Sequence, residues 1–189
     1  MKIYSGGGDQ GKTSLYSGER VAKNHPYMEA GGDVDELNSA IGGIKTLLPS
    51  DCGHILSDLS QIQSNLMKIG AYIATSRDSA AIDKVPKISD ADVKNLETAI
   101  DTLQIDLPNL TGFIIPNGHI SAVMAHIART VCRRAERHVV GLSLQIGFGE
   151  APKHLRYQLV YLNRLSDYFF VLARYLNHVT GVAEDLWKS

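Results

Sequence analysis

Apolar residues recur at intervals of three and four over most of the chain, which is the spacing that places side chains on one face of an α-helix. The pattern predicts a first helix over 33–48, a second over 55–74, a shorter third after Ser89, a fourth over 119–146 and a fifth over 152–178. Strand patterns are almost absent. The sequence therefore predicts an all-α fold, a five-helix bundle with ferritin-like up-down packing.

The signals expected at helix ends support these boundaries. Pro49 ends the first run, Ser89 followed by Asp92 resembles a capping box, and Pro152 is a favoured residue in a first helical turn. Acidic residues between Gly31 and Asn38 lie where the first predicted helix starts, and carboxylates are stabilised there by the helix dipole. Gly147 and Gly149 are placed to end the fourth helix.

Two stretches fall outside the helical pattern. Residues 1–28 are rich in Gly, Ser and Lys, and we expect them to form an ordered loop, a glycine-rich N-terminal arm. The stretch 108–118 is a connector that holds an apolar island at 113–116. With 189 residues and no linker, we expect one domain, with a nucleotide-binding arm over 1–28 and a helical bundle over 31–180.

Composition excludes several classes of protein. Hydrophobic residues make up 44% and charged residues 21%, as in ordinary globular proteins. The formal net charge of −1 gives no overall field that would attract nucleic acid or an anionic membrane. No apolar run reaches the length of a signal peptide or a membrane span. Cys52 and Cys132 lack metal-ligand spacing, so we expect reduced thiols and a cytoplasmic protein. The charge balance and the short apolar runs lead us to expect no nucleic-acid or membrane partner.

The glycine-rich stretch 6–13, GGGDQGKT, fits the Walker A pattern letter by letter. A P-loop needs a buried strand before it and a helix after it, but only five residues precede this stretch and no Walker B strand follows. We therefore predict against a P-loop NTPase fold. Glycine backbone N–H groups with Lys12, Thr13 and Ser14 nevertheless suit a polyphosphate and its Mg²⁺. A flexible tail is the alternative interpretation.

A second candidate site lies on the fourth predicted helix. Arg129, Arg133 and Arg137 are four residues apart and form one ridge, with Arg134 and Glu136 beside them. The fifth helix interrupts its apolar pattern with polar residues that need partners, namely Asn163, Arg164, Ser166 and Asp167. Together these residues indicate a site for a charged ligand. A solvated helix face is the alternative.

Asp35 is a candidate partner for this ridge. Helix capping is sufficient to explain its position, but its carboxylate could also face Arg133 across the bundle in a partly buried ion pair. The seven histidines show no metal-ligand spacing, so we expect no metal site made of protein ligands. No GxSxG elbow or Cys/His pair indicates a covalent intermediate.

Taken together, these clusters resemble the PduO-type ATP:cob(I)alamin adenosyltransferases. The resemblance covers most of the chain, and its two longest stretches are the most specific. It is carried by residues 4–5, 8–9 with Gly11, 18–21 with Lys23, 32–38 with 41–42, and 113–116. It is carried most strongly by ARTVCRRAER at 128–137 and YLNRLSDYF at 161–169.

The resemblance implies a five-helix bundle that forms a homotrimer, with ATP bound between neighbouring subunits. The implied reaction moves the 5′-deoxyadenosyl group of ATP, bound with Mg²⁺, to reduced cobalamin and releases triphosphate. A reductase and an adenosylcobalamin-dependent enzyme are the implied protein partners.

The family pattern also implies roles for single residues. Asp35 would pair with Arg133, and Phe113 would press on the lower face of the corrin and displace its axial base. The residues implied to wrap the triphosphate are Ser5, Gly6, Gly7, Gly8, Thr13, Ser14 and Lys23, with Mg²⁺ near Thr13 and Ser14. The residues implied to complete the nucleotide site are Arg133, Arg134, Glu136, Arg137 and Asn163.

The sequence departs from the family pattern at one point. Family members usually carry Thr-Arg/Lys-Thr-Gly-Asp where this chain has SGGGD at 5–9, so one cation and one hydroxyl are missing. Lys12 is the candidate replacement for that cation. Two other functions stay open at this point: a non-catalytic ATP-binding regulator or cofactor-delivery protein on the same bundle, and a Walker-type phosphohydrolase.

Overall fold

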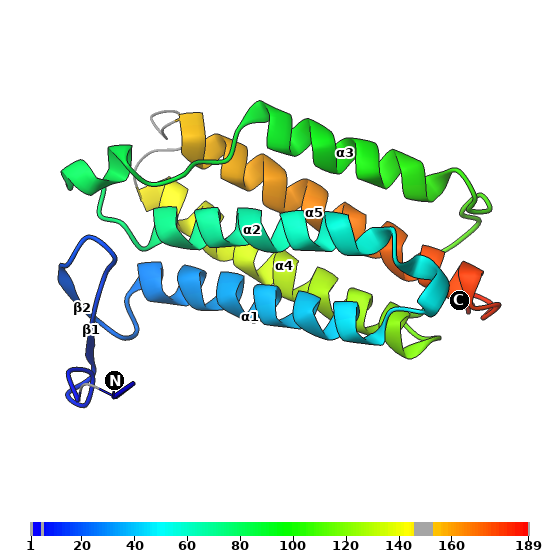
Figure 1. The fold of residues 1–189 in the computed structure, drawn as a ribbon, viewed down its shortest axis with the longest axis horizontal. Coiled ribbons are helices and arrows are strands. Elements are labelled where there is room, and N and C mark those ends of the chain that lie inside the picture. Colours follow the sequence, from blue (N-terminus) through cyan, green and yellow to red (C-terminus); the bar gives the residue numbers. More distant parts are fainter. Residues whose placement is uncertain (1, 5, 146–152, 189) are drawn as a thin grey trace.

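The structure is a computed structural model, and it describes residues 2–4, 6–145 and 153–188. Five α-helices lie side by side and alternate in direction along the bundle (Figure 1). Their bounds are α1 Pro26–Leu47, α2 Ile55–Ile73, α3 Asp90–Gln104, α4 Ile120–Gln145 and α5 Lys153–Val179. Short 3₁₀ helices occupy Ser50–Cys52 and Ala80–Asp83. The predicted all-α five-helix bundle is confirmed, and none of the helices in the described ranges has the length and apolarity that a membrane crossing needs.

Helix α4 lies between α1 and α5, while α3 packs on α5 and α2 packs on α1. The face of α4 that meets its neighbours is built from small residues, because Ala122, Ala125, Ala128 and Ala135 are all fully buried. Small side chains let the backbones approach closely. Helix α5 supplies the bulky part of the core with Tyr161, Tyr168 and Phe169. The result is a rigid support for the polar face of α4.

Helix α1 begins at Pro26, seven residues before the predicted start at Asp33. The His25 side chain accepts a hydrogen bond from the N–H of Tyr27 (3.3 Å), and proline at the first helical position has a backbone angle that suits a helix. Gly31 and Gly32 therefore lie inside the helix. Helix capping is the wrong explanation for the acidic residues that follow them, because these lie beyond the first turn.

The ends of the later helices follow the prediction where the structure describes them. Ser89 accepts from the N–H of Asp92 while the Asp92 carboxylate accepts from the N–H of Ser89, so the predicted capping box is confirmed. The predicted ends at Gly147, Gly149 and Pro152 lie outside the described residues.

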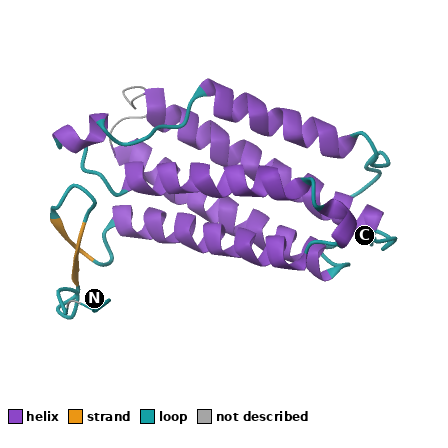
Figure 2. Cartoon of the chain, viewed as in Figure 1, coloured by secondary structure: helices purple, strands orange, loops and turns teal. Residues whose placement is uncertain are grey.

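The N-terminal segment contains a feature that the sequence did not predict. Strands β1 (Lys12–Ser14) and β2 (Arg20–Ala22) pair antiparallel, and they are the two strands seen beside the helices in Figure 2. We call residues 6–25 the N-terminal hairpin. Its turn docks on the end of α2, where Tyr16 N–H donates to the Ala74 carbonyl (2.7 Å) and Ser76 N–H donates to Ser17 Oγ (2.8 Å). Strands of three residues are too short to show an alternating pattern.

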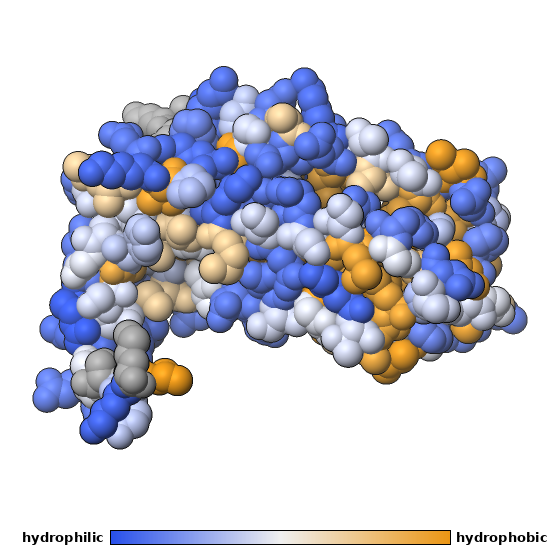
Figure 3. Space-filling model, in the orientation of Figure 1, coloured by the Kyte–Doolittle hydropathy of each residue, from blue (hydrophilic) through white to orange (hydrophobic). Residues whose placement is uncertain are grey.

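The opposite end of the bundle is closed by two further segments. The connector between α3 and α4 (residues 105–119) and the C-terminal tail (residues 180–188) pair through an antiparallel bridge between Ile114 and Leu186. Asn177, near the end of α5, donates to the Asn117 carbonyl (3.1 Å) and accepts from the N–H of His119 (2.9 Å). Apolar atoms on the visible face gather toward this end (Figure 3).

Gly118→Ala is expected to destabilise this end of the bundle. Gly118 has φ +113°, and a Cβ there would overlap the side-chain amide of Asn177. Backbone strain and a lost buried hydrogen bond together should lower the free energy of unfolding by about 2–4 kcal/mol. Chemical denaturation measures this value. The matched control is Gly112→Ala, which meets open space and should change stability by less than about 1 kcal/mol. Equal effects of the two substitutions would contradict the explanation.

Candidate functional site

The polar face of α4 presents two arginines, Arg133 and Arg137, for which the described residues supply no carboxylate partner. Arg133 and Arg137 are exposed, and Arg137 Nη1 donates to the Arg133 main-chain carbonyl (3.1 Å). In the described part of the chain, neither guanidinium has an ion pair with Asp or Glu. By contrast, Arg134, Arg164 and Arg174 each pair with a carboxylate. The ridge is therefore a local concentration of uncompensated positive charge that suits a polyanion.

Arg129, one turn before Arg133, extends the ridge into the bundle. Its Nε is buried and has no hydrogen-bond partner among the described residues. Burial lowers the pKa of Arg129, and the neighbouring charge of Arg133 lowers that pKa further. A buried donor without a partner costs free energy, so a ligand atom that accepted a hydrogen bond from Arg129 Nε would remove this cost.

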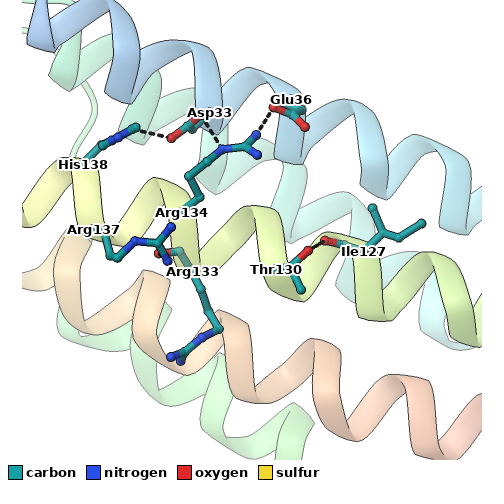
Figure 4. A network of polar contacts seen from close by, with 8 residues as sticks. All are labelled: Asp33, Glu36, Ile127, Thr130, Arg133, Arg134, Arg137 and His138. Atoms are coloured by element: carbon teal, nitrogen blue, oxygen red, sulfur yellow. Dashed lines mark hydrogen bonds and ion pairs between the residues drawn. The ribbon is translucent and has the colours of Figure 1, made fainter. Parts of the chain in front are cut away.

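Arg134 points the other way, toward α1 (Figure 4). Its Nε donates to Asp33 Oδ1 (3.0 Å), and Nη2 donates to Glu36. His138 Nδ1 lies 2.6 Å from the second oxygen of the same carboxylate, and the Asp33 residue is 8% exposed. These carboxylates raise the pKa of Arg134, with the Asp33 hydrogen bond as the largest cause. The network fixes the rotation of α4 about its axis relative to α1.

This network corrects the predicted pairing of Asp35 with Arg133 across the bundle. The bonds that join the two helices run from Arg134 to Asp33 and Glu36, and Asp35 is exposed. Successive residues on a helix point about 100° apart, so Arg133 leaves α4 in a different direction from Arg134. In Figure 4 the Arg133 side chain extends away from α1.

The structure brings together Glu136 and Asn163, which the sequence placed on two different helices. Asn163 Nδ2 donates to Glu136 Oε1 (2.9 Å), and Arg164 Nη1 donates to Asn163 Oδ1 (2.8 Å). Arg164 is held in turn by Glu97 of α3 (2.9 Å). Of the four polar residues predicted to need partners in the fifth helix, Asn163 and Arg164 belong to this chain of hydrogen bonds from α3 to α4. Ser166 Oγ donates to the Asn163 main-chain carbonyl, and Asp167 is exposed.

The glycine-rich stretch forms tight turns at the base of the N-terminal hairpin. Gly6 and Gly11 adopt positive φ, which glycine alone tolerates easily. Gly8 makes room for a cation, since a Cβ at that position would lie 3.2 Å from Lys23 Nζ. Thr13 is half-buried in β1, while Lys12 and Ser14 are exposed on either side of it. Ser5 lies outside the described residues.

The surroundings of this stretch confirm the prediction against a P-loop NTPase fold. The stretch leads into β1, whose neighbour is the antiparallel β2, and the two strands form the whole sheet in the described residues. A Walker loop instead joins a parallel strand to a helix. Gly6, Gly7, Gly8, Thr13, Ser14 and Lys23 therefore share one hairpin, as far as the structure describes them.

Sequence reasoning missed Arg20 as a functional residue. Its Nη2 donates to the Gly7 carbonyl (2.6 Å) and its Nη1 to Ser14 Oγ (3.4 Å), so one guanidinium joins the glycine turn to β1. The signal was the position of Arg20 directly opposite Ser14 in an unrecognised hairpin.

Phe113 lies in the connector, and it is 78% exposed. Its neighbour is Trp187 of the C-terminal tail, whose ring meets it edge-on with centroids 6.5 Å apart. The Trp187 N–H also donates to the Phe113 carbonyl (2.8 Å). Two exposed aromatic rings on hydrogen-bonded backbone offer a surface for a flat apolar ligand. Trp187 is the second residue that sequence reasoning missed.

Within one chain these groups do not meet at one point. The N-terminal hairpin lies at the start of α1, and the connector between α3 and α4, which carries Phe113, lies at the other end of the bundle (Figure 1). The hydrogen bonds found for residues 8–14 in the described ranges stay within the hairpin. Nor do the described residues contain three or more His, Cys, Asp or Glu side chains grouped closely enough to hold a metal ion. The arrangement offers a cationic surface that suits a polyanion.

Comparison with known proteins gives a consistent result. The cobalamin adenosyltransferase family profile matches residues 3–176. The chain is 40% identical over 190 residues to the corrinoid adenosyltransferase MMAB of Bos taurus, covering all of this chain and 76% of that protein. It is 41% identical over 189 residues to the cobalamin adenosyltransferase of Cupriavidus metallidurans, covering 99% of this chain and 94% of that one.

A solved structure is also similar over the whole chain. It is that of a variant PduO-type ATP:corrinoid adenosyltransferase from Lactobacillus reuteri, complexed with cobalamin and ATP. The TM-score is 0.88 at 36% identity, and the alignment covers 100% of both chains.

Asp33→Asn is expected to loosen the contact between α1 and α4. It removes a buried carboxylate shared by Arg134 and His138, so the free energy of unfolding should fall by about 1–3 kcal/mol. Denaturation with urea, followed by far-ultraviolet circular dichroism, measures the change. Asp35→Asn is the matched control, because the Asp35 side chain is exposed, and it should cost less than about 0.5 kcal/mol. A larger cost for Asp35→Asn would assign the helix contact to the wrong carboxylate.

Proposed function

The chain belongs to the cobalamin adenosyltransferase family, and from that premise we propose how its residues divide the work of the reaction. The protein is an ATP:corrinoid adenosyltransferase that moves the 5′-deoxyadenosyl group of ATP to cobalamin. The observation that carries the proposal is the pair of exposed arginines, Arg133 and Arg137, without carboxylate partners in the described part of the chain.

The chemistry explains why such a site needs no protein nucleophile. Cobalt(I) donates its electron pair to C5′ of ATP and forms the cobalt–carbon bond, while the C5′–O5′ bond breaks and triphosphate leaves with the electron pair of that broken bond. The protein must align C5′ with cobalt and stabilise the charge that develops on the leaving group. Cationic side chains, with the Mg²⁺ that ATP carries, meet the second requirement.

We assign the departing triphosphate to Arg133 and Arg137. Both guanidinium groups are exposed on one ridge, and the described residues supply no carboxylate that would have to be displaced first. Glu136 and Asn163, joined by a 2.9 Å hydrogen bond, border the ridge and would bind the remaining polar groups of the nucleotide. Arg134 is already bonded to α1, so its proposed role is to hold α4 in place beside the nucleotide.

The N-terminal hairpin would supply the other half of the phosphate site. Gly6, Gly7 and Gly8 offer backbone amides, Lys23 offers a cation beside Gly8, and Thr13 and Ser14 offer hydroxyls near the Mg²⁺ of the nucleotide. Ser5 and Lys12 belong to the same proposed set. The hairpin extends beyond the end of its own bundle, so we propose that it reaches the arginine ridge of a neighbouring copy in a homotrimer.

Phe113 would act on the corrin. Its exposed ring is proposed to press on the lower face and displace the axial base, which makes four-coordinate cob(II)alamin easier to reduce. Asp35, exposed on α1, is proposed to meet a basic partner from another copy. The reaction consumes cob(I)alamin, so a reductase must supply electrons and an adenosylcobalamin-dependent enzyme must use the product. We place both partners with this protein in the cytoplasm.

One assay tests the proposed function. The protein is incubated with ATP, Mg²⁺ and chemically reduced cobalamin, and visible absorbance follows formation of the cobalt–carbon bond. We expect adenosylcobalamin and intact triphosphate in equal amounts. Orthophosphate without a corrinoid product would indicate a phosphohydrolase. ATP binding without either product would indicate a regulator or a delivery protein.

Arg137→Ala is expected to lower turnover by about 100- to 1,000-fold, the usual cost of removing one group that stabilises charge in the transition state. The helical circular dichroism signal should be unchanged, because the Arg137 side chain is exposed. Arg156→Ala is the matched control, since it removes an exposed arginine from α5 and should retain full turnover. Loss of helical signal in Arg137→Ala would instead make Arg137 a structural residue.

A further inference from the structure

The C-terminal tail is hydrogen-bonded to the segment that carries Phe113. The N–H of Ile115 donates to the Asp185 carbonyl (2.8 Å), and the N–H of Trp187 donates to the Phe113 carbonyl (2.8 Å). The Asn117 side chain also donates to the Asp185 carboxylate. Backbone bonds to the tail thus flank the Phe113 side chain, which has little packing of its own to fix it.

A buried arginine joins this pairing to the bundle. Arg174 of α5 is 6% exposed, and its guanidinium binds both oxygens of Glu184 in the tail, Nε to Oε1 at 2.7 Å and Nη2 to Oε2 at 3.3 Å. Nη2 also donates to the Pro108 carbonyl at the start of the stretch that leads to Phe113 (2.7 Å). One guanidinium therefore fixes the tail and the connector to the same point of α5.

The chemistry of this contact is specific. A two-oxygen contact between Arg and a carboxylate fixes orientation as well as distance, which a single hydrogen bond does not. Burial excludes the water that would otherwise compete for the guanidinium. Asn177, about one turn further along α5, adds a second attachment. Its main-chain carbonyl accepts from the N–H of Val182 (2.9 Å), and its side-chain amide donates to the Asn117 carbonyl.

We propose that Arg174 and Glu184 are positioning residues for the corrin side of the site. Their ion pair holds the tail against the connector, and the paired backbones set the height and direction of the Phe113 ring and of Trp187 beside it. This inference rests on the proposed function, in which Phe113 contacts the corrin. Neither Arg174 nor Glu184 touches the substrate in this assignment; they act through Phe113.

The proposal predicts different effects on ATP affinity and on the corrin side of the reaction. The end of α5, which carries Arg174, and the C-terminal tail, which carries Glu184, lie at the end of the bundle opposite the N-terminal hairpin (Figure 1). Neither residue is bonded to Arg133 or Arg137 in the described residues. Loss of the ion pair should therefore leave the dissociation constant for ATP within about twofold. It should lower the fraction of bound cob(II)alamin that becomes four-coordinate, and lower turnover about 10- to 100-fold through misplacement of the ring.

Two variants separate positioning from simple stability. Glu184→Gln leaves the Arg174 charge buried without a counterion, so it should lower both the melting temperature and turnover. The double variant Arg174→Leu with Glu184→Leu removes both charges. Replacing a buried ion pair by apolar residues usually restores stability, but it does not restore the hydrogen bond to Pro108. Asp90→Asn is the matched control, because it breaks the exposed ion pair with Lys94 (2.6 Å) in α3.

The measurements are the melting temperature, ATP affinity by calorimetry, the electron paramagnetic resonance spectrum of cob(II)alamin bound with ATP, and turnover. We expect the double variant to recover the melting temperature but neither the four-coordinate signal nor turnover. Recovery of all three together would overturn the positioning role. Asp90→Asn should match the unmodified protein throughout. If the unmodified protein made no adenosylcobalamin, the proposed function itself would fail, whichever result the variants gave.

Discussion

The structure depends on how positive charge is distributed along α4 and α5. Arg134, Arg164 and Arg174 are each tied to a carboxylate of another segment and act as structural connections. Arg133 and Arg137 project from the same framework without such partners in the described residues. Two such cations one turn apart repel each other by about 0.2–0.5 kcal/mol, which the contacts that hold the backbone of α4 readily offset. Here the buried alanine face of α4 and the Arg134 network hold it.

The sequence predicted most of the helices that form this framework, but not all of their ends. Five helices followed from apolar spacing, because a buried helix face repeats every three or four residues whatever its neighbours are. The start of α1 did not follow, since two glycines hid a helix that Pro26 and His25 begin. The hairpin at β1 and β2 was also missed, because pairing over three residues leaves no periodic pattern. Local signals predict elements well and predict their ends less well.

The sequence predicted which residues make up the candidate site better than it predicted the contacts among them. The sequence identified the arginine cluster, yet neither spacing nor family resemblance could say which arginine faces which carboxylate. Adjacent residues differ by about 100° around the helix, so one position decides between an anchor and a free cation. Arg20, Trp187 and Glu184 were missed for a related reason: each acts through a partner at least ten residues away in the chain, Arg20 on the carbonyl of Gly7, Trp187 on Phe113 and Glu184 on Arg174.

At each end of the bundle, an arginine fixes a backbone segment by hydrogen bonds. At one end a cation, Arg20, donates to the Gly7 carbonyl and joins the glycine turn to β1. At the other end a buried cation, Arg174, fixes a strand pairing whose aromatic rings face outward for an apolar ligand. In both places the group that would meet the substrate is exposed and has little packing of its own, so its geometry must come from the backbone beneath it. A hydrogen-bonded cation supplies that geometry without occupying the binding surface.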